Sequence, residues 1–420
     1  MSAQKSRREP RKSDMRKEQG RPETSVPAAG RGIAANLPTI SLLVLVLFFL
    51  FTSRIVYAPL LLSLEESLGL SHARAASFFL FITIGYGSLM LFSGFVAARL
   101  GHRTTILLAL LVTVAALAVV ASSRSLWGMR AGLILLGMGS GLYFPSGIPT
   151  LVSLVEDRDA GKALAMHELG PNLSFVLTPI AAVLLLRFVS WRIILLLLGG
   201  FGIAVWLLFL LFAKGGRFHG KPPHLANARL ILPRPSFWIL AGLFALGAGA
   251  GIGIFSMTPT YLIAERAMDP ELVNTLVGLA RVASLAMVFL AGYLADRYGI
   301  QRILSAVLLL SGLATAILGV AFKPVLIAAV FVQPVLIASF FPVAFVAISR
   351  IAPQRLYNLT ISFMLPMVYT VGYGLVPYFL GLLGDRASFA TGFYIYGGLL
   401  VCAAGFPFLL KLRQLGGSAS

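Results

Sequence analysis

The chain has 420 residues, of which 58% are hydrophobic and only 12% are charged. Because soluble globular chains carry about 25% charged residues, this composition excludes a soluble protein and is typical of a membrane protein. The formal net charge of +19 fits either a nucleic-acid partner or basic loops on the cytoplasmic side of a membrane. The single cysteine excludes an internal disulfide and a paired-cysteine metal site, and we expect no metal and no other cofactor.

Residues 1–36 form a polar segment with nine Lys/Arg and four Asp/Glu. The segment is too long and too mixed in charge for the start of a signal peptide. We therefore predict a disordered cytoplasmic tail.

Apolar runs of membrane-spanning length follow this tail. A spanning helix needs about 20 apolar residues, and nine runs of that length contain no charge, while three more contain one internal charge. Their length and their apolar character on all faces exclude the short alternating strands of a membrane barrel. The twelve predicted spans are 37–64, 75–98, 104–123, 131–155, 163–186, 193–213, 235–264, 272–295, 303–322, 324–349, 356–384 and 387–410.

The distribution of Lys and Arg orients these spans. With both termini in the cytoplasm, the cytoplasmic segments carry 24 Lys/Arg and the opposite segments carry eight, as the positive-inside rule requires. This asymmetry also accounts for the net charge, so we expect no nucleic-acid partner.

The basic loop 214–234 is the longest polar connection and divides the spans six and six. We predict an all-α membrane protein with twelve transmembrane helices in two pseudo-symmetric six-helix bundles, residues 37–213 and 235–411. Residues 412–420 would form a second cytoplasmic tail. We expect a monomer embedded in a lipid bilayer.

A Gly-rich, basic motif occurs twice, after the second and after the eighth span. Its residues are Gly94, Ala98, Arg99, Gly101 and Arg103 in the first copy and Gly292, Asp296, Arg297 and Gly299 in the second. With the twelve spans and the basic central loop, the motif resembles the signature of the major facilitator superfamily over about residues 37–412. The resemblance implies secondary transport by two rocking halves. Both copies become candidates for gating, because glycine lets helices approach closely and Asp296 can latch a neighbouring helix end. The alternative is a basic anchor at the membrane surface.

The first half carries a finer resemblance. Its residues are Arg54 and Tyr57 in the first span, Gly85, Tyr86 and Gly87 in the second, and Gly137, Gly141 and Pro145 in the fourth. They are similar to the organic-anion branches of the superfamily, which include the anion:cation symporters and the glycerol-3-phosphate (organophosphate) transporter group. The resemblance implies that Arg54 binds an anion. The organophosphate members also use an arginine in the seventh span, and none occurs here, so a monocarboxylate fits better than a phosphate.

Only three charged side chains lie well inside the predicted spans, namely Arg54, Glu168 and Arg281. A charge in the bilayer core is costly, so each one marks a transport pathway or a buried pair. The planar guanidinium of Arg54 is suited to a carboxylate, and Tyr57 shares its helix face. The alternative is an ion pair between Arg54 and Glu168. Arg281 is a second candidate for binding the anion, with a bond to a main-chain carbonyl or a snorkelling side chain as the alternative.

Glu168 is the main candidate for proton coupling, because an unpaired carboxyl in an apolar setting tends to hold its proton. Pro171 is expected to disturb the helix there, and Asn172 shares the face of Glu168 and is a candidate for binding the substrate. His167 is a second candidate for proton coupling, with an interhelical hydrogen bond as the alternative. Tyr86 and Tyr369 are further candidates for binding the substrate, and Tyr143, Gln333 and Tyr373 are weaker candidates for lining a cavity.

These features favour a secondary active transporter of a small, monocarboxylate-like organic anion with proton coupling, in a bacterial inner membrane. Exchange of one anion for another is compatible with the same residues, and an efflux pump for drug-like or amphipathic compounds is the main alternative. The chain has no Gly-x-x-x-x-Gly-Lys-[Ser/Thr] loop, which argues against transport driven by ATP. The sequence shows no Ser/His/Asp set and no metal cluster at membrane-surface depth, so we do not expect an enzyme.

The unequal copies of the motif lead to a testable expectation. Asp296→Asn removes the charge of the latch and should slow transport about two- to fivefold, which is the range of one charge acting at a helix end. Ala98→Asn in the first copy should matter less. Transport rates of both variants in liposomes, at equal protein content, would check this, and equal losses would contradict a latch in the second copy alone.

Overall fold

Long apolar helices make up almost all of the chain that the computed structural model describes, residues 32–220, 229–351 and 356–412. Within those ranges there is no β-strand. The predicted N-terminal tail up to residue 31, residues 221–228 of the central loop and residues 413–420 lie outside the described parts.

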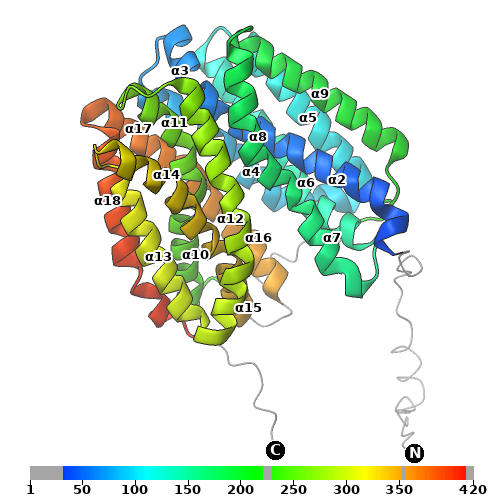
Figure 1. The fold of residues 1–420 in the computed structure, drawn as a ribbon. Helices are drawn as coiled ribbons and strands as arrows, with labels where there is room; N and C mark the ends of the chain where they lie inside the picture. Colours follow the sequence, from blue (N-terminus) through cyan, green and yellow to red (C-terminus); the bar gives the residue numbers. More distant parts are fainter. Residues whose placement is uncertain (1–31, 221–228, 352–355, 413–420) are drawn as a thin grey trace, which may run out of the picture.

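The first half of the chain forms one helical bundle (Figure 1). Its elements are α2 (Ile33–Ile55), α3 (Tyr57–Leu68), α4 (His72–Leu100), α5 (His102–Ser122), α6 (Leu126–Val152), η1 (Asp157–Asp159), α7 (Ala160–His167), α8 (Leu169–Leu186) and α9 (Trp191–Phe212). Helix α2 begins four residues before the predicted start at 37. The amide of Asn36 donates to the carbonyl of Leu154 at 2.6 Å, which ties this first turn to the bundle.

The second half forms the other bundle. Its elements are α10 (Pro235–Ala248), η3 (Gly249–Gly253), α11 (Ile254–Ala264), α12 (Pro270–Tyr298), α13 (Ile300–Ile317), α14 (Lys323–Ala338), α15 (Phe340–Ile351), α16 (Tyr357–Tyr369), η5 (Thr370–Leu375), α17 (Val376–Arg386), α18 (Phe389–Ala403) and η6 (Phe406–Leu409). In the described chain, 11 segments are long and apolar enough to cross a membrane. Helix α12, with 29 residues, packs beside α8 and α14 and completes the twelve. The predicted fold class is confirmed.

Proline explains two breaks within the spans. Proline lacks an N–H, and its ring clashes with the carbonyl four residues earlier. Helix α2 ends at Ile55, four residues before Pro59, and α7 ends at His167, four residues before Pro171. The expected disturbance at Pro171 is therefore present, and it places Glu168 between two helices.

Glycine marks two further irregular segments, the π-helical turns η3 and η5. A π turn widens the helix and occurs frequently at functional sites. The two segments lie against each other, because a Cβ on Gly372 would stand 2.8 Å from the main-chain nitrogen of Gly249. No side chain larger than hydrogen fits at this crossing.

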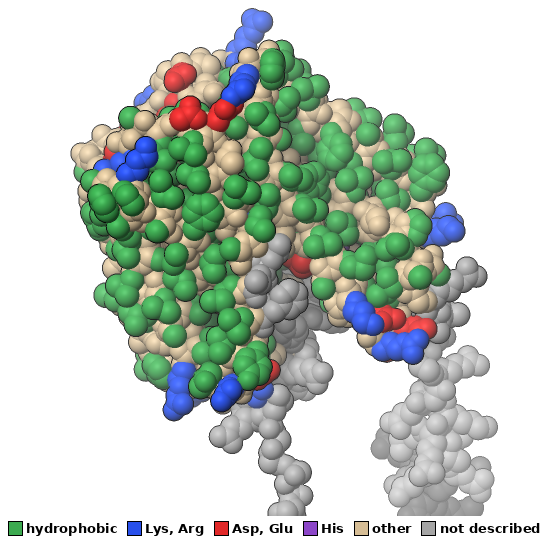
Figure 2. Space-filling model, in the orientation of Figure 1, with side chains coloured by type: hydrophobic (Ala, Val, Ile, Leu, Met, Phe, Trp, Pro, Cys, Tyr) green, Lys and Arg blue, Asp and Glu red, His purple; other side chains and the backbone are tan. Residues whose placement is uncertain are grey.

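The two halves meet along two seams. Helix α4 packs against α16, η5 and α17, while α8 packs against α12, and α3 packs against α11. We call the end of the molecule where the described chain starts and stops the terminal face, and the opposite end the far face. Figure 2 shows a hollow between the bundles that opens toward the terminal face. Hydrophobic side chains cover much of the visible surface and charged ones gather at its two ends, as in an integral multi-pass membrane protein.

Two glycines bring α4 and α6 into backbone contact. A Cβ on Gly137 would overlap the carbonyl oxygen of Ile82 and stand 2.7 Å from the nitrogen of Tyr86. A Cβ on Gly85 would stand 3.0 Å from the nitrogen of Met138. This contact fixes the position of α4, and with it the position of Tyr86.

We expect Gly137→Ala to destabilise the protein by about 1–3 kcal/mol, the usual cost of overpacking. Gly200→Ala on α9 is the matched control, because no described atom lies within 4 Å of a Cβ at that position. Melting temperatures of both variants in one detergent would check this. An unchanged melting temperature for Gly137→Ala would contradict the backbone contact.

Candidate functional site

A small cavity lies between the two halves. Its volume is about 30 Å³, which is room for about one water molecule. The first half contributes Phe51, Arg54, Ile55, Phe79, Ile82, Thr83 and Tyr86, and the second half contributes Ile252, Ser256, Tyr369 and Tyr373. In this conformation the cavity is too small for an organic substrate. The predicted residues Arg54, Tyr86 and Tyr369 all line it.

The cation of the cavity is Arg54, at the end of α2. Its guanidinium carbon lies 4.3 Å from the centre of the Phe51 ring and 4.6 Å from that of Tyr86, distances at which aromatic rings attract a cation. The buried Nε of Arg54 donates no hydrogen bond to any described residue. Within the described ranges Arg54 forms no ion pair with a carboxylate, so the expected alternative of a pair with Glu168 is not observed.

Three tyrosines connect the two sides of the cavity. The ring of Tyr86 in the first half lies 5.1 Å from that of Tyr369 in the second, and Tyr369 lies 4.8 Å from Tyr373. The helices approach closely enough because glycines flank the tyrosines. A Cβ on Gly374 would stand 3.0 Å from the Cα of Leu80 in the first half, for example.

Arg281 lies outside this cavity and binds the backbone. Its guanidinium donates to the carbonyl of Gly251 in η3, beside Gln333, whose amide donates to the carbonyl of Ala250 at 2.9 Å. Both side chains line a second cavity of about 20 Å³ inside the second half. Anion binding, a bond to a main-chain carbonyl and a snorkelling side chain were the interpretations considered for Arg281. This conformation displays the bond to a main-chain carbonyl.

An aromatic row nevertheless links the two arginines. The ring of Phe51, which contacts Arg54, lies 5.9 Å from Phe175, and Phe175 lies 5.1 Å from Phe255. The guanidinium of Arg281 lies 4.6 Å from the ring of Phe175 and 4.7 Å from that of Phe255. Sequence reasoning missed this row, since phenylalanine in an apolar span carries no distinguishing signal.

His167 and Glu168 lie at the break between α7 and α8. The imidazole of His167 is fully buried and stacks on the ring of Tyr143, with its Nε2 at 2.7 Å from the Tyr143 hydroxyl. That hydroxyl donates to the carbonyl of Leu43 at 3.2 Å. The Nδ1 of His167 lies 3.9 Å from a carboxylate oxygen of Glu168, whose side chain is 55% exposed. The break brings together two groups that would diverge on an intact helix.

Two other predicted residues are placed outside the cavity. The hydroxyl of Tyr57 is buried, makes no hydrogen bond with the described residues, and does not line the cavity. The amide of Asn172 donates to the main-chain carbonyl of Glu168 at 2.7 Å. Asn172 therefore bonds to the backbone at the break and does not line the cavity, where a role in binding the substrate was predicted for it.

The first copy of the gating motif anchors the start of the central loop. Arg103 donates to the carbonyls of Ala213 and Leu210 at the end of α9, and its own main-chain nitrogen donates to Gly216 at 2.8 Å. Gly101 has φ +78°, a conformation that favours glycine. Gly94 and the exposed Arg99 lie on the last turns of α4.

The second copy forms few contacts. Asp296 is exposed and has no ion-pair partner in the described chain, and Arg297 donates to the hydroxyl of Tyr293 at 3.1 Å. Gly299 has φ +92° and begins α13. No described atom lies within 4 Å of a Cβ on Gly292, so the close helix contact expected at this glycine is absent in this conformation.

Several residues of the cavity were not predicted, among them Phe51, Phe79 and Thr83, and they carry no distinguishing signal in the sequence. A repeated tripeptide marks Tyr86 and Tyr373, which were predicted. The tripeptide Gly-Tyr-Gly occurs at residues 85–87 and again at residues 372–374, and the tyrosine of each copy lines the cavity. Ile252 and Ser256 lie in and after the glycine-rich turn η3. Among the residues that the structure describes, no group of three or more His, Cys, Asp or Glu is placed to hold a metal ion.

Solved structures share this architecture at low sequence identity. A bacterial homologue of the human lysosomal transporter Spinster, in an inward-facing and occupied conformation, is 15% identical, with a TM-score of 0.76 over 89% of this chain and 96% of that one. A D-xylose-proton symporter is 16% identical, with a TM-score of 0.74 over 90% and 98%. A peptide transporter in complex with sulfate is 14% identical, with a TM-score of 0.75 over 92% and 96%. At these identities the likeness shows the fold alone.

Comparison by sequence identifies the family. No curated protein matches the chain. The family model described as Major Facilitator Superfamily matches residues 43–280 and 254–417, which together span most of the sequence. The chain belongs to the major facilitator superfamily.

Proposed function

We propose that this protein is a secondary active transporter that moves a small organic monoanion together with a proton by alternating access. The observation that carries the proposal is Arg54, a cation in the cavity between the halves with no carboxylate partner among the described residues. A cation inside a membrane span without a carboxylate partner is costly. An anionic substrate would supply that partner and bind two N–H groups of the guanidinium at once.

The lining of the cavity supports a monocarboxylate. Arg54 is its only cation within the described residues, since Arg281 is bonded to Gly251. A second negative charge on the substrate would remain unpaired. The remaining wall is aromatic and aliphatic, with hydroxyls from tyrosine, Thr83 and Ser256, which suits a small apolar body with one carboxylate.

The arrangement of the halves supports alternating access. The excess of Lys/Arg on the segments of the terminal face favours a cytoplasmic position for that face, and the hollow of Figure 2 would then open inward. In an inward-facing state the cytoplasmic latch predicted at Asp296 would be released, and Asp296 is indeed exposed. We place the protein as a monomer in a bacterial inner membrane, with both termini cytoplasmic.

The pair of His167 and Glu168 supports coupling to protons. Because the hydroxyl of Tyr143 donates to Leu43, its oxygen accepts the Nε2–H of His167. In the neutral ring Nδ1 is then the unprotonated nitrogen, and it faces Glu168 at 3.9 Å. A proton taken up between them is shared by an imidazole and a carboxylate.

Efflux of drug-like or amphipathic compounds is the second candidate, because the cavity is lined mainly by aromatic and aliphatic side chains. Exchange of one anion for another would use the same Arg54 without net proton movement. Binding and transport measurements on variants of Arg54, Glu168 and His167, compared with control variants, separate these possibilities.

We expect Arg54→Gln to weaken the binding of monocarboxylates about ten- to a hundredfold, the value of losing one charged hydrogen-bonding partner. A panel from acetate to benzoate, tested by thermal shift on the purified protein, would check this. Arg192→Gln is the matched control. Its guanidinium also contacts an aromatic ring and main-chain carbonyls, but at the far end of α5.

Two outcomes would contradict this assignment. If Arg54→Gln and Arg192→Gln weaken binding equally, Arg54 has no special role in holding the anion. If no carboxylate stabilises the protein while lipophilic cations do, and Arg54→Gln leaves that response intact, the efflux function is favoured.

We expect Glu168→Gln to abolish accumulation driven by a proton gradient while leaving exchange of labelled for unlabelled anion intact. An inward gradient of one pH unit sustains about a tenfold gradient of a monoanion carried with one proton, because each unit is worth about 1.4 kcal/mol. In proteoliposomes the wild type should approach that ratio, and Glu168→Gln should stay near unity.

His167→Gln should reduce the same accumulation, and His219→Gln, on the exposed start of the central loop, should not. Full accumulation by Glu168→Gln would rule out this carboxylate as the coupling site. Accumulation that ignores the pH gradient in the wild type itself would favour anion exchange.

A further inference from the structure

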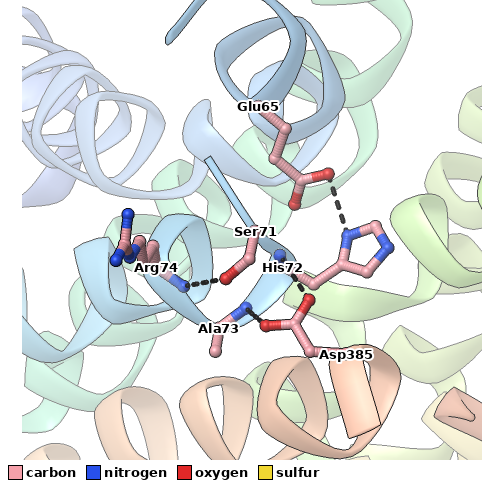
Figure 3. A network of polar contacts seen from close by, with 6 residues as sticks. All are labelled: Glu65, Ser71, His72, Ala73, Arg74 and Asp385. Carbon is pink, nitrogen blue, oxygen red and sulfur yellow. Dashed lines mark hydrogen bonds and ion pairs between the residues drawn. The ribbon is translucent and has the colours of Figure 1, made fainter. Parts of the chain in front are cut away.

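The far face holds a second pair of histidine and carboxylate, on the opposite side of the cavity from His167. Figure 3 shows Glu65 and His72 of the first half meeting Asp385 of the second. We propose that these three residues form a proton-responsive gate: a proton on His72 holds the two halves together at the far face, and its loss loosens them.

The contact between the halves is a helix cap. Asp385 lies in the last turn of α17, and its two carboxylate oxygens accept hydrogen bonds from the main-chain nitrogens of His72 and Ala73, each at 2.9 Å. The first N–H groups of a helix have no partner within the helix and carry partial positive charge. The approach needs Gly381, where a Cβ would stand 2.7 Å from the carbonyl oxygen of His72. Helix α4 is therefore capped by a residue of the other half, and the cap breaks if the halves separate here.

The titratable group at this contact between the halves is the imidazole of His72. Its Nδ1 lies 2.9 Å from Oε2 of Glu65, and its ring lies 4.9 Å from that of Phe389 in the second half. The side chain of Glu65 is only 8% exposed, and its Oε1 accepts no hydrogen bond from the described residues. A buried carboxylate with a free oxygen favours a full positive charge on the imidazole beside it.

Two further carboxylates act on the ring in the same direction as Glu65, namely Asp385 and Glu265 of the second half. The other charged residues within two positions of these groups in the sequence are Glu66, Arg74, Arg266 and Arg386. The carboxylate of Glu265 accepts from the main-chain nitrogen of Phe389 at 2.6 Å and adds negative charge from the second half. Arg266 donates to the carbonyl of Gly319, and the side chain of Arg74 points away from Asp385 in Figure 3. Carboxylates of both halves therefore act on the ring, and only that of Glu65 bonds to it.

The sign of the pH effect follows from this geometry. A protonated ring attracts Asp385 and Glu265 of the second half, and it presents a cation to the ring of Phe389. These attractions are lost when the ring is neutral. Low pH on the far side should therefore favour the closed far face, and high pH should favour its opening. A proton bound from that side would accompany closure.

A second contact between the halves provides an internal control. Arg187 at the end of α8 pairs with Glu271 at the start of α12, on the other seam of the far face. Neither member of this pair is a histidine, the residue type whose ordinary pKa lies in the range of about pH 5 to 8. Weakening this pair should loosen the far face equally at every pH in that range.

Distance measurements between two spin labels test the proposal. Arg124→Cys and Phe322→Cys place labels on exposed far-face positions of opposite halves, in a Cys402→Ser background that removes the native thiol. In lipid nanodiscs we expect one short distance at about pH 6, and a longer-distance population that grows about three- to tenfold by about pH 8.5.

The variants assign the effect to His72. His72→Gln should show the longer distance at both pH values, and His72→Lys, a permanent cation, should show the shorter one at both. Glu271→Gln should raise the open population by the same factor at both pH values, and His219→Gln should behave as the wild type. A wild type whose distances ignore pH would overturn the proposal. So would a pH response retained in His72→Gln or in His72→Lys.

These measurements read conformation and need no substrate. A negative result would therefore leave the anion site at Arg54 untouched. The proposal rests on the proposed transport function in one respect, namely which side of the membrane supplies the proton. The pH-dependent closure of the far face is tested by the label distances alone, without any gradient.

Discussion

A lipid bilayer offers no water to a free main-chain carbonyl, so each break in a spanning helix must be satisfied from within the protein. In the described chain the breaks and the groups that satisfy them occur together. Arg281 and Gln333, from two neighbouring helices, donate to the carbonyls of η3, and Asn172 donates to the carbonyl at the Glu168 break. These three polar side chains thus hold irregular backbone in place. The irregular turns η3 and η5 also contribute Ile252 and Tyr373 to the cavity wall.

The two arginines illustrate how this constraint separates structure from function. Both lie on the same aromatic row, which offsets part of the cost of removing a guanidinium from water. Arg281 donates to the carbonyl of Gly251 in η3, whereas Arg54 forms no ion pair with a described carboxylate; the buried Nε atoms of both arginines lack a hydrogen-bond partner among the described residues. An aromatic contact uses the face of the guanidinium and leaves its in-plane N–H groups available. In the proposed function these N–H groups of Arg54 would bind a planar anion, whereas Arg281 bonds to η3, whose Ile252 lines the cavity.

The sequence was sufficient for the fold, because span length and the Lys/Arg asymmetry are local properties. It also isolated Arg54, Glu168 and Arg281, since charges are rare in these spans. It could not tell which arginine faces the cavity. The spans are apolar on all sides, so periodicity does not fix their rotation, and the break at Val56 lies between Arg54 and Tyr57. Contacts such as that of Asp385 with His72, 313 residues apart, arise only when the halves pack.

The breaks and caps also connect the two ends of the molecule. One histidine–carboxylate pair lies beside the hollow of the terminal face, at the break that separates α7 from α8, and the other lies at the closed far face, where α4 is capped by α17. The cavity at Arg54 lies between them, bordered by α4, which extends from the capped end to Tyr86 in the cavity wall. A ligand shifts a conformational equilibrium only through its different affinity for the two states. A proton that is held by carboxylates of both halves at the far face has such a difference, because one of its partners moves away when that face opens.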